Sequence, residues 1–275
     1  MVHLSFLFKD ILMQNSEKCH ENVWILSGTA DGPILARRLL ELNYSVFISV
    51  VSYKASKVYP ENNKLHIITG RLIDENSIQK FIFNNEITHI IDATHPFAQK
   101  ISENLENACR KIQFFKIYKY ERRKENYSNP IKISDFRELA NFELKNKNIL
   151  LAIGSRSLDV FANFYINSGA NVYARILATP EAISKGLSSC VRNSNIAILN
   201  PSKEKQDSLE SYLCNYWKID YVLCRESGSY TQELWDQLCL STNKKLFLLK
   251  RPKTFDHSLV FSEYDELIQK ISIAE

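Results

Sequence analysis

Five loops carry the residues of this chain whose types and spacing suit chemistry. Each follows directly on a short run of apolar, largely β-branched residues, and together they span 27–31, 92–98, 154–156, 175–181 and 225–228. Ligands of open α/β sheets bind outside the carboxyl ends of the strands. We therefore expect the binding and catalytic side chains to lie in these five loops.

The loop at 27–31 reads Ser-Gly-Thr-Ala-Asp and stands between an expected strand at 23–26 and an expected helix that Pro33 opens. Such a turn can present helix N-terminal N–H groups to the phosphates of a dinucleotide. The candidate cofactor-binding residues here are Gly28, Thr29 and Asp31. Only part of the GxGxxG fingerprint is present, so a tight turn capped by Asp31 or Gly32 explains the same residues equally well.

The loop at 92–98 reads Asp-Ala-Thr-His-Pro-Phe-Ala, with Pro96 where the first turn of the next helix is expected. Asp92, Ala93 and Thr94 are further candidates for cofactor binding, and His95 is placed to act on a ligand. The structural alternative is that Thr94 or His95 caps the helix while Asp92 holds the turn.

Arginine recurs in the other three loops, beside small or hydroxyl residues. A guanidinium forks onto both oxygens of a carboxylate, and neighbouring backbone N–H groups add further bonds. The candidate substrate contacts are Ser155, Arg156, Arg175, Thr179, Arg225, Ser227 and Gly228, together with His95 and Phe97 from the loop at 92–98. Each arginine taken singly is more often a solvated surface group, but three on one side of a sheet favour an anionic ligand.

Short β-branched runs alternate with segments of helical period from residue 23 onward, which predicts βαβ units on parallel sheets. Expected strands lie at 23–26, 46–51, 65–69, 90–92 and 114–118 in one group and at 149–153, 172–176, 196–199, 221–224 and 246–249 in another. A charged, Asn-rich stretch at 121–147 contains the boundary. We predict an α/β protein of two Rossmann-like domains, 21–130 and 131–275, with mostly parallel sheets and an interdomain cleft, preceded by an extension at 1–20.

Composition and charge limit the class of protein. The 275 residues are 45% hydrophobic and 24% charged, as in an ordinary soluble globular protein. A net charge of +4, from 35 Lys and Arg against 31 Asp and Glu, is too small and too interspersed for a nucleic-acid binder but is compatible with an anionic small molecule. The six cysteines form no CxxC pair, so their spacing predicts neither a metal site nor a disulfide framework. Because no run of about 18 apolar residues is present, we expect no membrane partner and a cytoplasmic protein.

The segment after the second expected strand bears on the choice of cofactor. NAD-specific Rossmann sites usually place an acid about 20 residues beyond the glycine turn, where it binds the ribose 2′-hydroxyl. Residues 49–57 read Ser-Val-Val-Ser-Tyr-Lys-Ala-Ser-Lys and contain no acid. Ser52, Lys54 and Ser56 could bind a 2′-phosphate instead, which favours NADPH over NADH; the alternative is an exposed polar loop with an incidental lysine.

The same loops resemble those of the precorrin-6A reductase family of cobalamin biosynthesis, including its cobalt-precorrin-6A counterpart. The segment at 92–98 is similar to the family's rare DATHPFA signature at every position. The segment at 27–31 resembles its GGTxE turn, 154–158 its GS(K/R)xL segment, 174–181 its ARxLPTPE loop and 225–228 its KDSG loop. The matches run in order over nearly the whole chain.

This resemblance implies a two-domain reductase that transfers a hydride from NADPH to a methine-linked tetrapyrrole and yields precorrin-6B or its cobalt form. The arginines would bind the carboxylates of that large substrate, and no protein-bound metal is implied. His95 is the only histidine in a matched motif, so it is the candidate general acid, although it could equally orient the nicotinamide or pair with a substrate carboxylate. Other enzymes of the cobalamin pathway are candidate partners.

Three residues depart from the family pattern. Ser27 stands where the family usually has Gly, Asp31 where it has Glu, and Ala178 where it has Pro. A serine could narrow the approach of a phosphate, and the shorter acid could lose a ribose or substrate contact. Two alternatives therefore stay open: an NADPH-dependent reductase of another anionic small molecule, and a catalytically silent nucleotide-binding protein.

Overall fold

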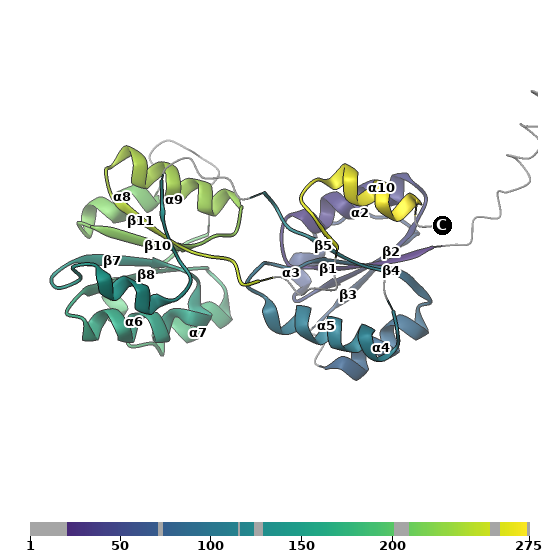
Figure 1. Cartoon of the computed structure of the whole chain (residues 1–275), viewed down its shortest axis with the longest axis horizontal. Coiled ribbons are helices and arrows are strands. Elements are labelled where there is room, and N and C mark those ends of the chain that lie inside the picture. The colour runs from purple at the N-terminus through teal and green to yellow at the C-terminus, as the bar shows by residue number, and fades with distance from the viewer. Residues whose placement is uncertain are drawn as a thin grey trace, which may run out of the picture. The chain divides into compact units, whose positions relative to one another are not determined.

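A computed structural model describes residues 21–70, 74–114, 116–123, 129–200, 209–253 and 259–273 of the chain. These residues form two compact units, each built on a parallel sheet of six strands (Figure 1). Unit 1 takes the described residues within Met1–Glu121 and Lys253–Glu275, and unit 2 takes those within Arg122–Pro252. The α/β class and the two Rossmann-like, parallel sheets expected from the sequence are confirmed, whereas the interdomain cleft stays a prediction.

The sheet of unit 1 has the strand order β12-β5-β4-β1-β2-β3. Its strands are β1 (Asn22–Ser27), β2 (Ser45–Val50), β3 (Leu65–Thr69), β4 (Ile87–Ala93), β5 (Ile117–Tyr120) and β12 (Leu259–Phe261), and its helices are α2 (Asp31–Glu41), α3 (Tyr53–Ser56), α4 (Glu75–Asn84), α5 (Gln99–Lys111) and α10 (Tyr264–Ile273). Side chains alternate across the sheet, so Val23 and Ile25 pack with α2 and α10 while Trp24 and Leu26 pack with α4 and α5 (Figure 1). Both faces are therefore buried, as a parallel sheet requires.

Unit 2 repeats this plan with the strand order β6-β11-β10-β7-β8-β9. Its strands are β6 (Ile131–Ile133), β7 (Asn148–Ala152), β8 (Asn171–Ile176), β9 (Ile196–Ile198), β10 (Tyr221–Arg225) and β11 (Lys245–Leu249), and its helices are α6 (Leu158–Asn167), α7 (Pro180–Leu187), α8 (Leu209–Tyr216) and α9 (Tyr230–Ser241), with 3₁₀ turns at Phe136–Asn141, Ser155–Ser157 and Asn193–Asn195. Leu151 and Leu223 face the α6 side, while Leu150 and Val222 face the α9 side.

Each sheet reverses its strand order at one place. In unit 1 the chain moves outward from β1 through β2 to β3, then crosses to β4 on the other side of β1. The same reversal separates β7 from β10 in unit 2. In open α/β sheets ligands bind at such a point, outside the carboxyl ends of the strands, and we call the loops that meet there the crevice of each unit.

The structure differs from the sequence-based division at the C-terminus. Residues 253–275 were expected in the second domain, but they join unit 1. The cause is β12, which pairs in parallel with β5, and the following helix, whose Leu267 and Ile271 enter the same core as Leu35. The three-residue strands β6 and β12 were not predicted. The expected extension at 1–20 lies outside the described residues.

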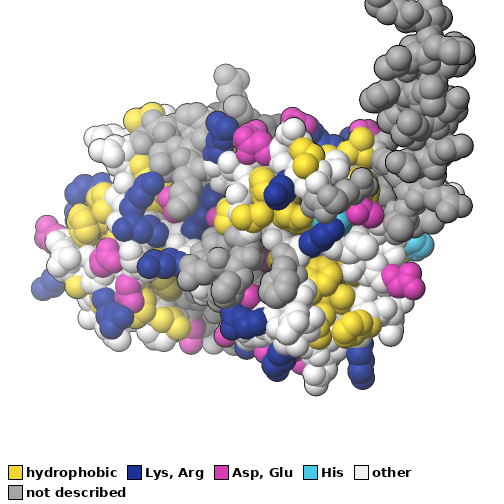
Figure 2. All heavy atoms as spheres, turned by 45° about the vertical axis from the view of Figure 1, so that its right-hand side comes forward, with side chains coloured by type: hydrophobic (Ala, Val, Ile, Leu, Met, Phe, Trp, Pro, Cys, Tyr) yellow, Lys and Arg dark blue, Asp and Glu magenta, His cyan; other side chains and the backbone are white. Residues whose placement is uncertain are grey.

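The surface and the helices agree with the charge and hydropathy of the sequence. On the face shown in Figure 2, Lys and Arg side chains are interspersed with Asp and Glu side chains. Among the described residues, no helix combines the length and the apolar character that crossing a membrane demands.

His89 is a buried polar residue of β4 with a consequence for stability. Its Nδ1 lies 3.0 Å from Thr88 Oγ1, its ring stacks on Tyr118, and its Nε2 has no hydrogen-bond partner among the described residues. Burial, with a smaller contribution from the positive charge of Lys116, lowers the pKa of His89 to about 4. The folded protein therefore keeps this imidazole neutral where the unfolded chain would protonate it.

We expect His89 to make the protein sensitive to acid. The unfolded imidazole binds a proton below a pKa of about 6.5, so the free energy of unfolding should fall between pH 6.5 and pH 4, by about 2 kcal/mol from this group at pH 5. In urea titrations at pH 7 and pH 5, His89→Gln should lose less stability on acidification than the wild type. The same substitution at the exposed His66 is the control. An equal loss in wild type and His89→Gln would contradict this role.

Candidate active site

The crevice of unit 1 brings together the first two of the expected site loops. Parallel pairing of β1 with β4 sets Ser27 beside Ala93, so the loops at 27–31 and 92–98 begin side by side. A Cβ atom added to Gly28 would lie 3.4 Å from the backbone nitrogen of His95 and from the Cα of Thr94. Pairing at the strand-order reversal is therefore what positions these two loops together.

The two glycines of the first loop serve different purposes. Gly32 is required by packing, because a Cβ there would collide with the hydroxyls of Ser27 and Tyr59. Gly28 has no positive φ, and a Cβ there would meet only ordinary van der Waals contacts. The fold does not require glycine at position 28, but a side chain there would occupy the space next to the backbone of Thr94 and His95. This open backbone fits the close approach of a dinucleotide phosphate.

Asp31 is bonded within the protein at both carboxylate oxygens. Tyr264 donates its hydroxyl to Oδ1 at 2.6 Å, and Thr29 donates to Oδ2 at 2.7 Å. The Thr29 hydroxyl also lies 3.2 Å from the carbonyl oxygen of Ala93. Asp31 thus ties the glycine turn to α10 and, through Thr29, to the end of β4.

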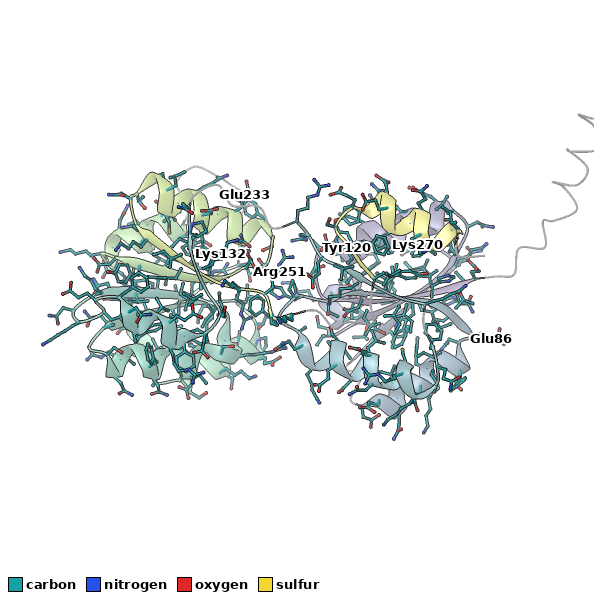
Figure 3. All side chains as sticks on the ribbon, viewed as in Figure 1. Glu86, Tyr120, Lys132, Glu233, Arg251 and Lys270 are labelled. Carbon is teal, nitrogen blue, oxygen red and sulfur yellow. The ribbon has the colours of Figure 1, made fainter. Side chains whose placement is uncertain are left out.

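Tyr264 comes from the C-terminal helix, and Tyr120, labelled in Figure 3, stacks on it with ring centroids 4.7 Å apart. Burial and the hydrogen bond to Asp31 raise the pKa of Tyr264 above its ordinary value. It therefore remains a neutral donor. Sequence reasoning did not find Tyr264, because nothing in the sequence indicates that residues 253–275 return to unit 1.

Ser27, one of the departures from the family pattern, points away from the open backbone of Gly28. Its Oγ accepts a hydrogen bond from Tyr59 at 2.7 Å and lies against Gly32 at the start of α2. Ser27 is buried, so its hydroxyl is accommodated inside unit 1.

Asp92 is the centre of a buried polar cluster at the end of β4. Its Oδ2 accepts from Lys119 Nζ at 2.8 Å and from Ser102 Oγ at 2.5 Å. Its Oδ1 accepts from the backbone N–H of Thr94 at 3.0 Å and from the Thr94 hydroxyl at 2.6 Å. Burial alone would raise the pKa of Asp92, but the Lys119 ammonium and the two hydroxyls outweigh it and lower the pKa below its ordinary value. The carboxylate holds the turn, as the structural alternative for Asp92 expected.

Lys119 was missed in the sequence. The expected strand at 114–118 stops one residue short of it, whereas β5 runs from Ile117 to Tyr120. A lysine between two tyrosines at the end of a largely aromatic run is the signal that could have found it.

His95 does not cap a helix. The helix α5 begins at Gln99, its N-cap residue is Ala98, and no side chain bonds to the cap. Instead, the backbone N–H of Phe97 donates to His95 Nδ1 at 3.2 Å. Because Nδ1 accepts this bond, the proton of the neutral ring lies on Nε2. His95 is half-buried and presents an Nε2 donor at the crevice loop.

The loop after β2 forms the short helix α3. Ser52 caps it by accepting from the backbone N–H of Ala55 at 3.3 Å, and Ser56 donates to the carbonyl of Tyr53 at 2.7 Å. Lys54 is exposed. The two serines therefore serve the helix, and Lys54 is the group of this loop best placed to meet an anion from solvent.

The crevice of unit 2 brings together two of the three expected arginines. Gly154 follows β7 with a φ of +77°, a conformation that favours glycine, and a Cβ there would lie 3.6 Å from Arg225 Nη1. Arg225 donates from Nη2 to Ser157 Oγ at 3.0 Å. Burial, with repulsion from the nearby Arg156, lowers the pKa of Arg225 to about 10. Arg156 itself is largely exposed, with its Nε 3.8 Å from Glu181 Oε1, and its repulsion of Arg225 favours a bound anion at this crevice.

The loop at 225–228 is anchored by its buried acid. Glu226 lies 3.1 Å from Lys132 Nζ and accepts from the backbone N–H of Arg251 at 3.2 Å, and Figure 3 labels both partners. Gly228 has a φ of +64°, and a Cβ there would press on Arg251 and on the backbone of Arg123. This loop is therefore rigidly attached to unit 2.

Arg175 does not join the other two arginines. It is 6% exposed, on the α8 side of β8, where its Nη2 lies 3.6 Å from Glu210 Oε1. Alternation along the strand buries it. Thr179 caps α7 by accepting from Ala182 at 3.3 Å, and Ser227 bonds to Ser229 at 2.7 Å. The substrate roles expected of Arg175, Ser155, Thr179 and Ser227 stay predictions.

The two glycines of the first loop give a matched test of the crevice. Gly28→Ala should leave the melting temperature nearly unchanged and raise the dissociation constant of the nicotinamide cofactor on the order of tenfold, because the new methyl group occupies the open backbone. Gly32→Ala should instead lower the melting temperature, because it collides with Ser27 and Tyr59. Thermal unfolding and cofactor fluorescence titration measure both. Unaltered cofactor affinity in a folded Gly28→Ala protein would show that the ligand does not approach here.

Comparison with known proteins agrees with these features. The family model described as Precorrin-6x reductase CbiJ/CobK matches residues 22–272. The cobalt-precorrin-6A reductases of Synechocystis sp. and Methanocaldococcus jannaschii are each 28% identical to the chain, over 84% and 91% of it and over 89% and 98% of their own lengths. A solved structure of CobK precorrin-6A reductase shares the fold with a TM-score of 0.72 at 19% identity, and covers 92% of this chain and 96% of that one. The chain thus belongs to the precorrin-6x reductase CbiJ/CobK family of oxidoreductases.

Proposed function

We propose that the protein reduces one double bond of precorrin-6A, or of its cobalt form, with NADPH as the hydride donor, and yields the corresponding precorrin-6B. The observation that carries the proposal is the family match over residues 22–272, which includes the loop at 92–98 beside the open backbone of Gly28. The identity of the reduced cofactor and the roles of single residues are part of the proposal.

The crevice of unit 1 would hold the cofactor, which supplies the hydride when bound. The open backbone at Gly28 and the N–H groups at the start of α2 suit its phosphates, and Lys54 suits a 2′-phosphate. Asp31 and Asp92 would act indirectly, since Thr29, Tyr264 and the Asp92 partners already occupy their oxygens. Their part is to hold the two loops in place.

Reduction of a carbon–carbon double bond adds a hydride to one carbon and a proton to its neighbour. His95 would donate from Nε2 as the imidazolium, which forms when the half-buried ring takes up a second proton from solvent at Nδ1 and releases the Phe97 N–H. Donation to the substrate carbon then returns the ring to its neutral form.

The crevice of unit 2 would bind the substrate. A tetrapyrrole polycarboxylate needs cations: Arg225 lies beside the Gly154 turn, and Arg156 is near enough to repel it. Association with other enzymes of the cobalamin pathway stays a prediction.

Anaerobic incubation of the purified protein with precorrin-6A or its cobalt form and NADPH tests the function. Absorbance should fall at the reduced-nicotinamide band while the macrocycle bands change in step. Oxidation of NADPH only with another anionic substrate would favour a different reductase, and binding without turnover of either form would indicate a silent nucleotide-binding protein.

Arg225 tests the substrate crevice. Arg225→Gln should weaken tetrapyrrole binding by roughly 10- to 150-fold, the effect of about 1.5–3 kcal/mol for a hydrogen bond to a charged group, and leave NADPH affinity nearly unchanged. Arg137→Gln is the matched control, since Arg137 is an exposed arginine of unit 2 paired with Asp135. Equilibrium titrations with each ligand make the comparison. An unchanged substrate affinity in Arg225→Gln would place the carboxylates elsewhere.

Lys54 tests the choice of cofactor. The ratio of kcat/KM for NADPH to that for NADH should exceed one and fall on Lys54→Ala, because the ammonium is lost from the 2′-phosphate. Lys80→Ala on the exposed side of α4 is the control. Equal values for the two cofactors in the wild type would refute the assignment, and a preference that survives Lys54→Ala would transfer the role to Ser52, Ser56 or Lys57.

A further inference from the structure

We propose that Lys119 is a positioning residue: by pairing with Asp92 it holds Thr94 and the His95 loop in the conformation that receives the cofactor. The statement that this loop receives the cofactor rests on the proposed function. The positioning itself is a property of the ligand-free protein.

The pair is built by strand register. Parallel pairing of β4 with β5 sets Asp92 directly beside Lys119, so both side chains emerge on one face. Both are buried, with side chains 5% and 6% exposed, and Lys119 Nζ lies 2.8 Å from Asp92 Oδ2. An unpaired charge at this depth would be costly, so each side chain requires the other.

Lys119 also reaches the two hydroxyls around the carboxylate. Its Nζ lies 3.3 Å from Thr94 Oγ1 and 3.4 Å from Ser102 Oγ. The cluster therefore joins four parts of unit 1: β4, β5, the first turns of α5 and the loop that carries His95. Most of the hydrogen bonds that join these parts are made to the carboxylate of Asp92.

The ionised form of Asp92 is what the loop needs. Both Thr94 groups donate to Oδ1, while Ser102 and Lys119 donate to Oδ2. A carboxylate accepts all four bonds, whereas a protonated acid must itself donate one. Loss of the Lys119 charge would leave burial to raise the pKa of Asp92, and the protonated acid would release part of the loop.

The surroundings of Asp92 contain few other titratable groups. Lys119 faces it from β5, Ser102 from α5 and Thr94 from the loop. Its register partner on β1 is the apolar Leu26, and His95 stands three residues along with its ring bonded to Phe97. Among the described residues, Lys119 is the charged group that the structure records as acting on Asp92.

The test compares Lys119→Met, Asp92→Asn and the double variant, with Lys116→Met as control. Lys116 is an exposed lysine just before β5. The double variant replaces a buried ion pair by neutral groups of similar size, a change that folds tolerate well. In it, the carbonyl of the new carboxamide at position 92 can still accept from Thr94 while its NH₂ group donates to Ser102, so the network re-forms without charge.

The first readout needs no ligand. The imidazole Cε1–H signal of His95, assigned by its loss in His95→Gln, is followed by NMR from pH 6 to pH 9. In Lys119→Met it should be displaced from the wild type at low pH and approach it as the pH rises and Asp92 ionises. The His95 signal of the double variant should lie closer to the wild-type signal and should not move toward it as the pH rises. The signal of Lys116→Met should coincide with that of the wild type.

The second readout is NADPH affinity by fluorescence titration over the same pH range. Lys119→Met should bind on the order of tenfold more weakly at pH 6.5, with the deficit shrinking toward pH 9, and the double variant should recover part of the loss. A wild type that fails to bind NADPH would refute the proposed function, while the NMR comparison still decides the role of Lys119.

Two results would overturn the proposal. One is a His95 signal in Lys119→Met that matches the wild type at every pH, and the other is a displacement that is independent of pH and equally large in the double variant. If Lys119→Met does not fold, the double variant is compared with Asp92→Asn, which leaves the lysine unpaired. A double variant no closer to the wild type than Asp92→Asn would then overturn it.

Discussion

The reversal of strand order between β1 and β4 is the constraint on which the first crevice depends. Helices α2 and α5 leave neighbouring strands for opposite faces of the sheet, while the loops before them stay in contact at the carboxyl edge, where the Thr29 hydroxyl meets the Ala93 carbonyl. Gly28 is exposed at this edge, and the backbone of His95 lies beside it. The same reversal at β7 and β10 creates the second crevice, where Gly154 and Arg225 meet.

The two crevices differ in charge although they share a plan. In unit 1 other residues of the same unit donate hydrogen bonds to the two carboxylates. Asp31 accepts from Tyr264 and Thr29, and Asp92 accepts from Lys119. In unit 2 burial, with a smaller contribution from repulsion by Arg156, lowers the pKa of Arg225 to about 10. A backbone-lined crevice suits a dinucleotide, and a cationic one suits a polycarboxylate.

The sequence predicts the strands that carry long apolar runs and the loops that come after them. The alternation of Val23 to Leu26 suffices for β1, and position after a strand suffices to single out 92–98 and 225–228. Contacts between segments that are distant in the sequence could not be predicted in this way. Tyr264 reaches Asp31 across 233 residues, and Lys119 reaches Asp92 only through strand register. Arg175 looks like Arg225 in sequence, yet alternation along β8 buries it against Glu210. The short strand β12 joins the sheet through its pairing with β5, another contact between segments that are distant in the sequence.

Amide hydrogen exchange with and without NADPH tests whether the crevice of unit 1 receives the nicotinamide cofactor. If it does, exchange should slow on binding at residues 28–32 and 94–98, with residues 154–157 and 225–228 little changed. Protection confined to 154–157 and 225–228, with 28–32 and 94–98 unaffected, would contradict it.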